Sequence, residues 1–343
     1  MSTYIITGGA GFIGTHLTDA LLRAGHHVRI IDDLSSGAAE NLDPGAEFIL
    51  GDVSDAALMR RVAGGAAGIF HLAAITSEQR SREDWAGAHR VNQGGTVAVL
   101  DAAREAGRIP VCYASSAAVY GDQGVRAIQE GARARPLTGY AADKLGSELH
   151  AGVAFHVHGV PTLGFRLFHI YGPRQDPASP YSSVLSNLAT RILGGQTITL
   201  HGDGLQVRDF VHVSDVVRHL FAGMQLIQRE PQSLVLNLCT GRGTTIRTLA
   251  DTLGMASARV PMMQFAAARP QEMRVLLGDP NEAIHVLGVE AGMELEAGLR
   301  TLLPAQPPSL LDWVRRAPSP RSGFENLPAE SSKAVPGSSF ARN

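Results

Sequence analysis

The stretch TYIITGGAGFIG, residues 3–14, decides the fold of this chain. A short apolar run predicts a β-strand, a turn carrying Gly8, Gly11 and Gly14 follows at once, and leucines at helical spacing then continue to Gly25. Because a helix start carries unpaired N–H groups and partial positive charge, glycines there let a pyrophosphate approach the backbone. An ordinary strand-to-helix turn can show the same glycines, but strand, glycine turn and helix in this order are typical of a dinucleotide-binding unit.

Apolar runs and longer helical patterns alternate from this stretch to about residue 170. This alternation predicts an α/β fold, a doubly wound parallel sheet of Rossmann type with helices on both faces. The predicted strands are Tyr4–Thr7, Val28–Ile31, Glu47–Leu50, Gly68–Leu72, Pro110–Ala114 and Thr162–Phe165.

The second predicted strand ends in Asp32 and Asp33, about 20 residues after the glycines. A carboxylate at that place can accept hydrogen bonds from both ribose hydroxyls of an adenosine and would repel a 2′-phosphate. Asp32 therefore predicts NAD as the cofactor, although an aspartate can also simply end a strand.

A serine, a tyrosine and a lysine follow in an order that suits redox chemistry. Ser116 ends a predicted strand, and Tyr140 and Lys144, four residues apart, share one face of a predicted helix. A neighbouring ammonium and a cationic nicotinamide would lower the pKa of a phenol toward neutral pH. Ser116 can bind the reacting oxygen, and Lys144 is the only lysine before the tail in a chain with 28 arginines. We therefore expect a catalytic group of Ser116, Tyr140 and Lys144.

The chain is expected to have three parts. Residues 1–170 form the nucleotide-binding domain, and residues 171–303 form a smaller interleaved substrate lobe, with some of the chain crossing back. The lobe is expected to hold a helix near Tyr181–Leu193 and strands near Ile198 and Leu234. Residues 304–343 hold seven of the 18 prolines and many serines. That composition predicts a largely disordered tail in which only Leu310–Arg316 can form a helix.

Composition narrows the remaining possibilities. With 343 residues, 44% of them apolar, the chain is expected to be globular, and a net charge of −2 gives no footprint for nucleic acid or an anionic membrane. No apolar run is long enough for a membrane helix, and two cysteines in apolar runs fit a reducing compartment. We expect a cytoplasmic protein with no nucleic-acid or membrane partner, and no metal, because the histidines lack ligand spacing.

Nine motifs in order resemble the extended short-chain dehydrogenase/reductase superfamily, and within it the NAD-dependent nucleotide-sugar epimerases of the UDP-glucose 4-epimerase type. The resemblance runs from residue 3 to about residue 303. The motifs are TGGAGFIG (7–14), IDDLSSG (31–37), GDVSD (51–55), HLAA (71–74), YASSAAVYG (113–121), YAADK (140–144), FRLFHIYGPRQDP (165–177), GDGLQVRDFVHVSDV (202–216) and ARPQE (268–272).

The resemblance implies an isomerase of nucleotide-sugar metabolism, of the kind that supplies polysaccharide biosynthesis, and it implies roles for particular residues. Ser116, Tyr140 and Lys144 would be catalytic, Arg208 and Arg269 would bind the diphosphate of a nucleoside-diphosphate sugar, and Asp52 would meet the adenine amino group. Glu272 would hold the ribose of the substrate nucleotide. The cofactor would be lined by Gly8, Gly11, Phe12, Ile13, Gly14, Asp32, Asp33, Asp52, Val53, Ala73, Asn92, Tyr140 and Lys144.

Two departures from the family pattern bear on the reaction. Ala117 and Ala118 stand where related dehydratases and decarboxylases carry an acid, which favours C4 epimerisation by way of a transient 4-keto sugar. His169 replaces an asparagine that touches the substrate, and the apolar Leu276 lies where the family tunes the sugar pocket, so neither the hexose nor the nucleotide is identified.

Two other functions stay open at this point: a reductase of nucleotide 4-keto-sugars using NADH or NADPH, and a non-enzymatic NAD-sensing protein. The resemblance also implies a homodimer formed through helices near residues 84–106 and 141–158.

Overall fold

A computed structural model describes residues 1–175, 184–268 and 273–303 of the chain. Residues 1–303 form one compact unit. The helix predicted within the tail lies outside the described residues, and the one predicted from Tyr181 is described from Val184 onward.

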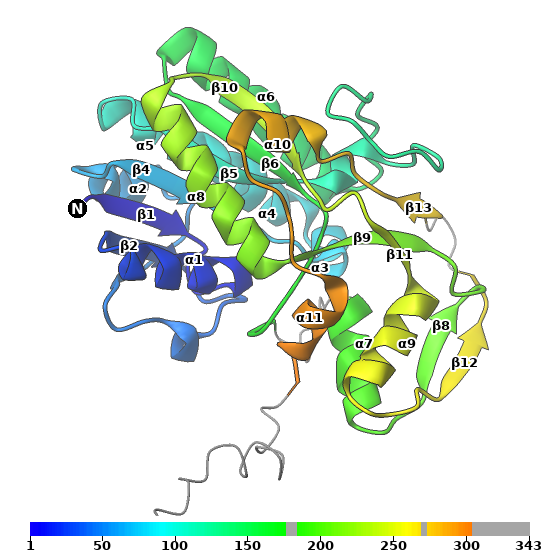
Figure 1. Cartoon of the computed structure of the whole chain (residues 1–343). Helices are drawn as coiled ribbons and strands as arrows, with labels where there is room; N and C mark the ends of the chain where they lie inside the picture. Colours follow the sequence, from blue (N-terminus) through cyan, green and yellow to red (C-terminus); the bar gives the residue numbers. More distant parts are fainter. Residues whose placement is uncertain (176–183, 269–272, 304–343) are drawn as a thin grey trace, which may run out of the picture. The chain divides into compact units, whose positions relative to one another are not determined.

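A parallel sheet of seven strands forms the centre of the molecule, in the order β10-β6-β5-β4-β1-β2-β3 (Figure 1). The six strands predicted before residue 170 all occur, within two residues of the expected ends, which confirms the doubly wound α/β fold. The order of strands reverses between β1 and β4, so the loops that follow these two strands lead to opposite faces of the sheet and leave a crevice at their carboxyl ends. The strands are β1 Thr3–Thr7, β2 His27–Asp32, β3 Glu47–Leu50, β4 Gly68–His71, β5 Val111–Ser116, β6 Thr162–Leu167 and β10 Ser233–Leu238.

Each face of this sheet carries its own apolar core, because neighbouring side chains of a strand point to opposite faces. Ile6 belongs to the core under α1 (Phe12–Arg23) and α8 (Val213–Arg229), which Figure 1 shows across the near face. Ile5 belongs to the core on the other face. That face is covered by α2 Ala56–Ala63, α5 Gly95–Glu105 and α6 Gly139–His158.

The later part of the chain adds two smaller sheets and crosses back to the large one. The strand predicted near Leu234 is β10, which pairs in parallel with β6 at the edge of the large sheet and lies outside the smaller sheets. A parallel neighbour needs a crossover, and α8 supplies it. The smaller sheets comprise β7 His169–Tyr171, β9 Val207–His212, β11 Gly243–Thr245 and β13 Val275–Leu276, and then β8 Ile198–His201 with β12 Met263–Ala266. The helices of this region are α7 Val184–Leu193, α9 Ile246–Ala256, α10 Asn281–Leu287 and α11 Leu295–Arg300.

Local signals fix both ends of the long helix α6. The Thr138 side chain caps its start by accepting a hydrogen bond from the Ala141 N–H, and Gly159 ends it in the left-handed conformation at φ +70°.

The first half of the chain also has short helical segments. They are the 3₁₀ turns Ala39–Asn41 and Ala117–Tyr120, the helices α3 Glu78–Glu83 and α4 Trp85–His89, and the π-helical turn Arg90–Gly94.

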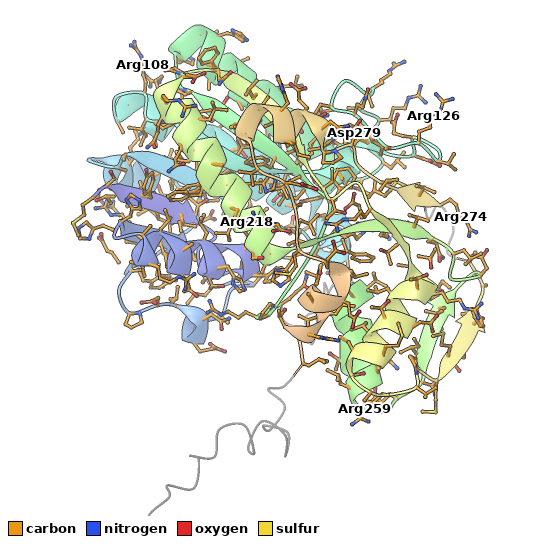
Figure 2. The ribbon with its side chains drawn as sticks, viewed as in Figure 1. Arg108, Arg126, Arg218, Arg259, Arg274 and Asp279 are labelled. Atoms are coloured by element: carbon orange, nitrogen blue, oxygen red, sulfur yellow. The ribbon has the colours of Figure 1, made fainter. Side chains whose placement is uncertain are left out.

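Arginine carries the positive charge of the surface. Figure 2 labels Arg108, Arg126, Arg259 and Arg274 at the rim of the molecule, and Lys144 is the only lysine that the described ranges contain. Across those same ranges, no helix has both the length and the hydropathy of a membrane span, and no His, Cys, Asp and Glu side chains gather in a group that could hold a metal ion.

Candidate active site

A cavity of about 880 Å³ fills the crevice where the strand order reverses. It runs from the glycine turn after β1, past the end of β2, to the serine, tyrosine and lysine on β5 and α6. A cavity of this size and length suits a dinucleotide together with part of a substrate.

The glycine turn forms one wall, and its glycines are required by close backbone contacts. Gly8 has φ +71°, and a Cβ there would lie 2.6 Å from the backbone nitrogen of Ala73. A Cβ on Gly14 would lie 2.3 Å from the carbonyl oxygen of Gly8. No side chain caps α1 at Gly11, so the N–H groups at its start are available to a phosphate. Phe12 and Ile13 also line this wall.

Asp32 lies at the end of β2 with its carboxylate buried against the glycine turn. Its two oxygens accept hydrogen bonds from the backbone N–H groups of Ala10 (3.0 Å) and Leu34 (2.9 Å). Burial raises its pKa above the usual value, against the effect of these two bonds. Each oxygen has a second lone pair, so Asp32 can also accept from a ribose. Asp33 lines the same cavity but is exposed, and it accepts from the Ser35 N–H.

Of four further residues predicted to line the dinucleotide, the structure places three at the cavity. Asp52, Val53 and Ala73 line the cavity, and Asp52 forms an ion pair with Arg90 at 2.8 Å. Asn92 does not line it: its amide accepts from the Ile75 N–H (2.7 Å) and donates to the Ile75 carbonyl (3.1 Å). Asn92 therefore holds the loop that follows β4, and it has no exposed amide to offer a cofactor.

Ser116, Tyr140 and Lys144 meet at the far end of the cavity. Ser116 ends β5, and its hydroxyl accepts from the Ala118 N–H at 3.1 Å. Lys144 donates to the carbonyl of Ala114 on the same strand at 2.8 Å, and its Nζ lies 5.7 Å from the centroid of the Tyr140 ring. The packing of α6 on the sheet thus brings Ser116 to Tyr140 and Lys144, which lie 24 and 28 residues further along the chain.

Burial dominates the acid–base properties of this group. It raises the pKa of Tyr140 to about 12, which a hydrogen bond with Ser116 partly offsets, and it lowers the pKa of Lys144 to about 8. The chain's own residues therefore do not bring the phenol to neutral pH. A cationic nicotinamide bound beside Tyr140 would lower this pKa, because a nearby positive charge favours the phenolate.

Two residues predicted to bind the substrate, His169 and Arg208, lie near one another, but neither lines the large cavity. His169 contacts Phe210 edge to face at 5.8 Å between ring centroids, and its Nδ1 is buried with no hydrogen-bond partner. Burial, helped by the charge of Arg208, lowers the pKa of His169 to about 3, so the ring is neutral. Arg208 lies on β9 opposite Leu276, which is itself buried. Arg269 and Glu272 lie outside the described residues.

Several cavity residues were missed by the sequence analysis. Gln175 and Arg174 line the large cavity, and Arg174 forms an ion pair with Asp19 at 2.7 Å. Trp85 and Leu137 line a second cavity beside Tyr140. Arg174 and Gln175 stand within a motif that was recognised, so their position could have been found; nothing local to the sequence marks Trp85 or Leu137.

Three features meet at one cavity: a Rossmann sheet, a glycine turn with an acidic residue on the next strand, and a Ser-Tyr-Lys group. Together they are typical of enzymes that use a dinucleotide for redox chemistry. The family model of the NAD dependent epimerase/dehydratase family matches residues 4–239. The chain belongs to this family, which confirms the resemblance and the prediction of NAD.

Individual relatives span several reactions. A UDP-glucose 4-epimerase of Mycolicibacterium smegmatis is 34% identical over 302 residues, covering 86% of this chain and 95% of the relative. A dTDP-glucose 4,6-dehydratase of an Actinoplanes strain is 30% identical over 280 residues, covering 73% of this chain and 86% of the relative. The crystal structure of Thermotoga maritima UDP-glucose 4-epimerase with UDP-glucose matches with a TM-score of 0.82 at 31% identity, covering 87% of this chain and 96% of that one.

Proposed function

We propose that the protein is an NAD-dependent epimerase that inverts C4 of a nucleoside-diphosphate hexose of the UDP-glucose/UDP-galactose type. The observation that carries the proposal is Ser116, Tyr140 and Lys144 at the end of a dinucleotide-sized cavity, with alanine at both positions after the serine. The similarity to UDP-glucose 4-epimerases over most of both chains supports it.

Each catalytic residue has its own role in the oxidation and reduction at C4. Tyr140 accepts the proton of the C4 hydroxyl and later returns it, while Ser116 holds the same oxygen by a hydrogen bond. Lys144 stabilises the phenolate and contacts the nicotinamide ribose. When bound, NAD would supply the hydride chemistry at C4, as acceptor in the oxidation and as donor in the reduction. The glycine turn would hold its pyrophosphate and Asp32 its adenosine ribose.

The nucleotide must stay bound while the keto hexose turns over. Arg208, on β9, and Arg269 are proposed to hold the diphosphate, because guanidinium groups form paired hydrogen bonds with phosphate oxygens. Glu272 is proposed to bind the ribose of the nucleotide, and His169 to contact the sugar or diphosphate through its neutral ring.

Elimination of water is disfavoured at this site. It requires an acid beside the sugar to protonate the departing hydroxyl, and Ala117 and Ala118 offer none; Ala117 is buried at 2% exposure. Reduction of a preformed nucleotide 4-keto-sugar needs no such acid, and it remains the second candidate. A protein that only senses NAD does not need the pair Tyr140 and Lys144, so the presence of both favours an enzyme.

A labelled substrate separates the two enzymatic candidates. UDP-glucose deuterated at C4 is incubated with purified protein and no added dinucleotide, and the products are analysed by NMR. An epimerase returns deuterium to C4 of UDP-galactose, because the cofactor that received it donates it. A strict requirement for added NADH or NADPH, with no inversion of any nucleotide hexose in a UDP, dTDP and GDP panel, would overturn the epimerase proposal.

We also propose a homodimer in the cytoplasm. Leu149, Val153 and Val157 on α6 and Val97 on α5 are apolar and between 40% and 68% exposed, and they lie on neighbouring helices of one face. Exposed apolar side chains gathered on one face are typical of a protein interface.

Both cysteines are buried and free, as expected in a reducing compartment.

A further inference from the structure

A second cavity, of about 340 Å³, adjoins the large one at the catalytic tyrosine. Tyr140 lines both cavities, so the two cavities meet at this residue. The smaller cavity is formed by α3 and α4 on one side and by the segment leading into α6 on the other, including Trp85, Leu137 and Thr138.

Two large apolar side chains remain exposed in this cavity. Trp85 is 68% exposed and Leu137 is 65% exposed. Exposed tryptophan and leucine next to a catalytic residue mark a binding surface more often than an isolated exposed side chain does.

The position of Trp85 is built into the local structure. It is the first residue of α4, whose start is capped by Asp84, with Oδ1 accepting from the Gly87 N–H at 2.9 Å. The indole lies against the start of α6, where a Cβ on Gly139 would be 2.9 Å from Nε1. Glycine at 139 therefore allows the indole to stand directly beside Tyr140.

We infer that Trp85 and Leu137 form an apolar wall for the hexose ring of the nucleotide sugar. The inference rests on the proposed function, since it takes the C4 hydroxyl of a hexose to be the group at Tyr140. A pyranose ring carries C–H groups on its faces, which pack favourably on an indole. Van der Waals contact is not directional, so such a wall accepts either face of the ring. A set of hydrogen bonds would hold only one face, whereas a keto hexose that turns over must present both.

Tryptophan fluorescence gives a test that needs no turnover. The chain has two tryptophans, Trp85 and Trp313, so Trp313→Phe leaves Trp85 as the sole emitter. The NAD-loaded variant is titrated with UDP-glucose, UDP-galactose and UDP, and binding is followed in parallel by calorimetry. We expect both UDP-hexoses to shift the Trp85 emission and UDP to leave it unchanged. Binding of UDP-hexoses with no change in emission, or the same change with UDP, overturns the inference alone. No binding of either hexose overturns the proposed function with it.

Substitutions provide the second measurement. Trp85→Ala should raise KM for UDP-glucose about 3- to 10-fold, the effect of losing one aromatic contact, without changing inhibition by UDP. Trp85→Phe should recover most of the loss. Phe265→Ala, at a residue on β12 that is 54% exposed and outside both cavities, is the control and should behave as wild type. A Trp85→Ala protein with unchanged KM and an altered oligomeric state would show that Trp85 serves an interface between subunits, against the inference.

Discussion

At the scale of single residues, the active site consists of groups whose ordinary chemistry has been changed by burial. The phenol of Tyr140 has a pKa of about 12, and the ammonium of Lys144, 3% exposed, has a pKa of about 8. Both changes disfavour the charged form, and both are reversed by placing an opposite charge nearby. The site therefore depends on cofactor and substrate to complete its electrostatics.

Tyr140→Phe should abolish turnover and retain binding. The substitution removes the proton acceptor but keeps the ring, and a general base contributes about 10²- to 10⁴-fold in rate. Initial rates and calorimetric binding of UDP-glucose provide the check. A rate within a few-fold of wild type would mean that another group is the base.

Lys144→Met should stabilise the protein at neutral pH. Between pH 8 and 10.5 the unfolded chain binds a proton that the native Lys144 does not, so this group's contribution to stability rises with pH there and is unfavourable below pH 8. Its full size is about 3 kcal/mol. Chemical denaturation should give the variant a larger free energy of unfolding than the wild type at pH 7, and the difference between the two should be smaller at pH 10. Lys333→Met, at the only other lysine, is the control; a pH-independent difference would contradict the assignment.

Asp32→Ala should weaken discrimination against NADP. The carboxylate is held by two backbone N–H groups at the predicted ribose position, and its charge repels a 2′-phosphate. Cofactor released from denatured wild-type protein should be NAD, and the ratio of NADP to NAD affinity should rise in the variant. Recovery of mostly NADP from wild type would contradict this role of Asp32.

At the scale of elements, a buried polar chain ties the glycine turn to the catalytic helix. His71, at the end of β4, hydrogen-bonds with Thr7 at the end of β1 (2.7 Å) and with Thr96 on α5 (3.1 Å). Thr96 in turn hydrogen-bonds with Ser147 on α6 at 3.0 Å. This chain joins four elements beneath the cavity, and a neutral imidazole at its centre suits it because both ring nitrogens have hydroxyl partners.

His71 should make the protein sensitive to acid. Burial lowers its pKa to about 3, so from pH 6.5 downward the unfolded chain binds a proton that the native state excludes, and stability falls as the pH falls. One such group contributes about 1.4 kcal/mol per pH unit. Denaturation between pH 7 and pH 5 measures how the free energy of unfolding changes per pH unit. This slope should be smaller by that amount in His71→Gln than in the wild type, even if the variant is less stable throughout. Equal slopes would show that His71 does not titrate as assigned.

At the scale of the whole molecule, strand order decides where chemistry occurs. The reversal between β1 and β4 sends the following loops to opposite sides, and the cavity lies between them. The return of the chain into β10 ties the later sheets to the edge of the large one, so that β9 and its Arg208 belong to the same compact unit as Tyr140.

Val153→Glu should convert the proposed dimer into monomers. The side chain is 51% exposed at the middle of the apolar row on α6, and a buried carboxylate without a partner is strongly unfavourable. Sedimentation velocity is the measurement. Met255→Glu, on α9 and 72% exposed, should leave the assembly unchanged; a monomeric wild type would contradict the dimer proposal.

The sequence by itself determined six of the seven strands of the large sheet and the glycine turn, because apolar runs and the glycines of a tight turn are local patterns of a few residues. It also indicated Ser116, Asp32, Tyr140 and Lys144, which stand within local motifs. Tertiary structure decided what depends on distant neighbours. It placed the Leu234 strand in the large sheet, turned the Asn92 amide onto Ile75, and set Trp85 beside Tyr140 through the space left by Gly139. These outcomes depend on which elements pack together, and no spacing along the chain encodes that.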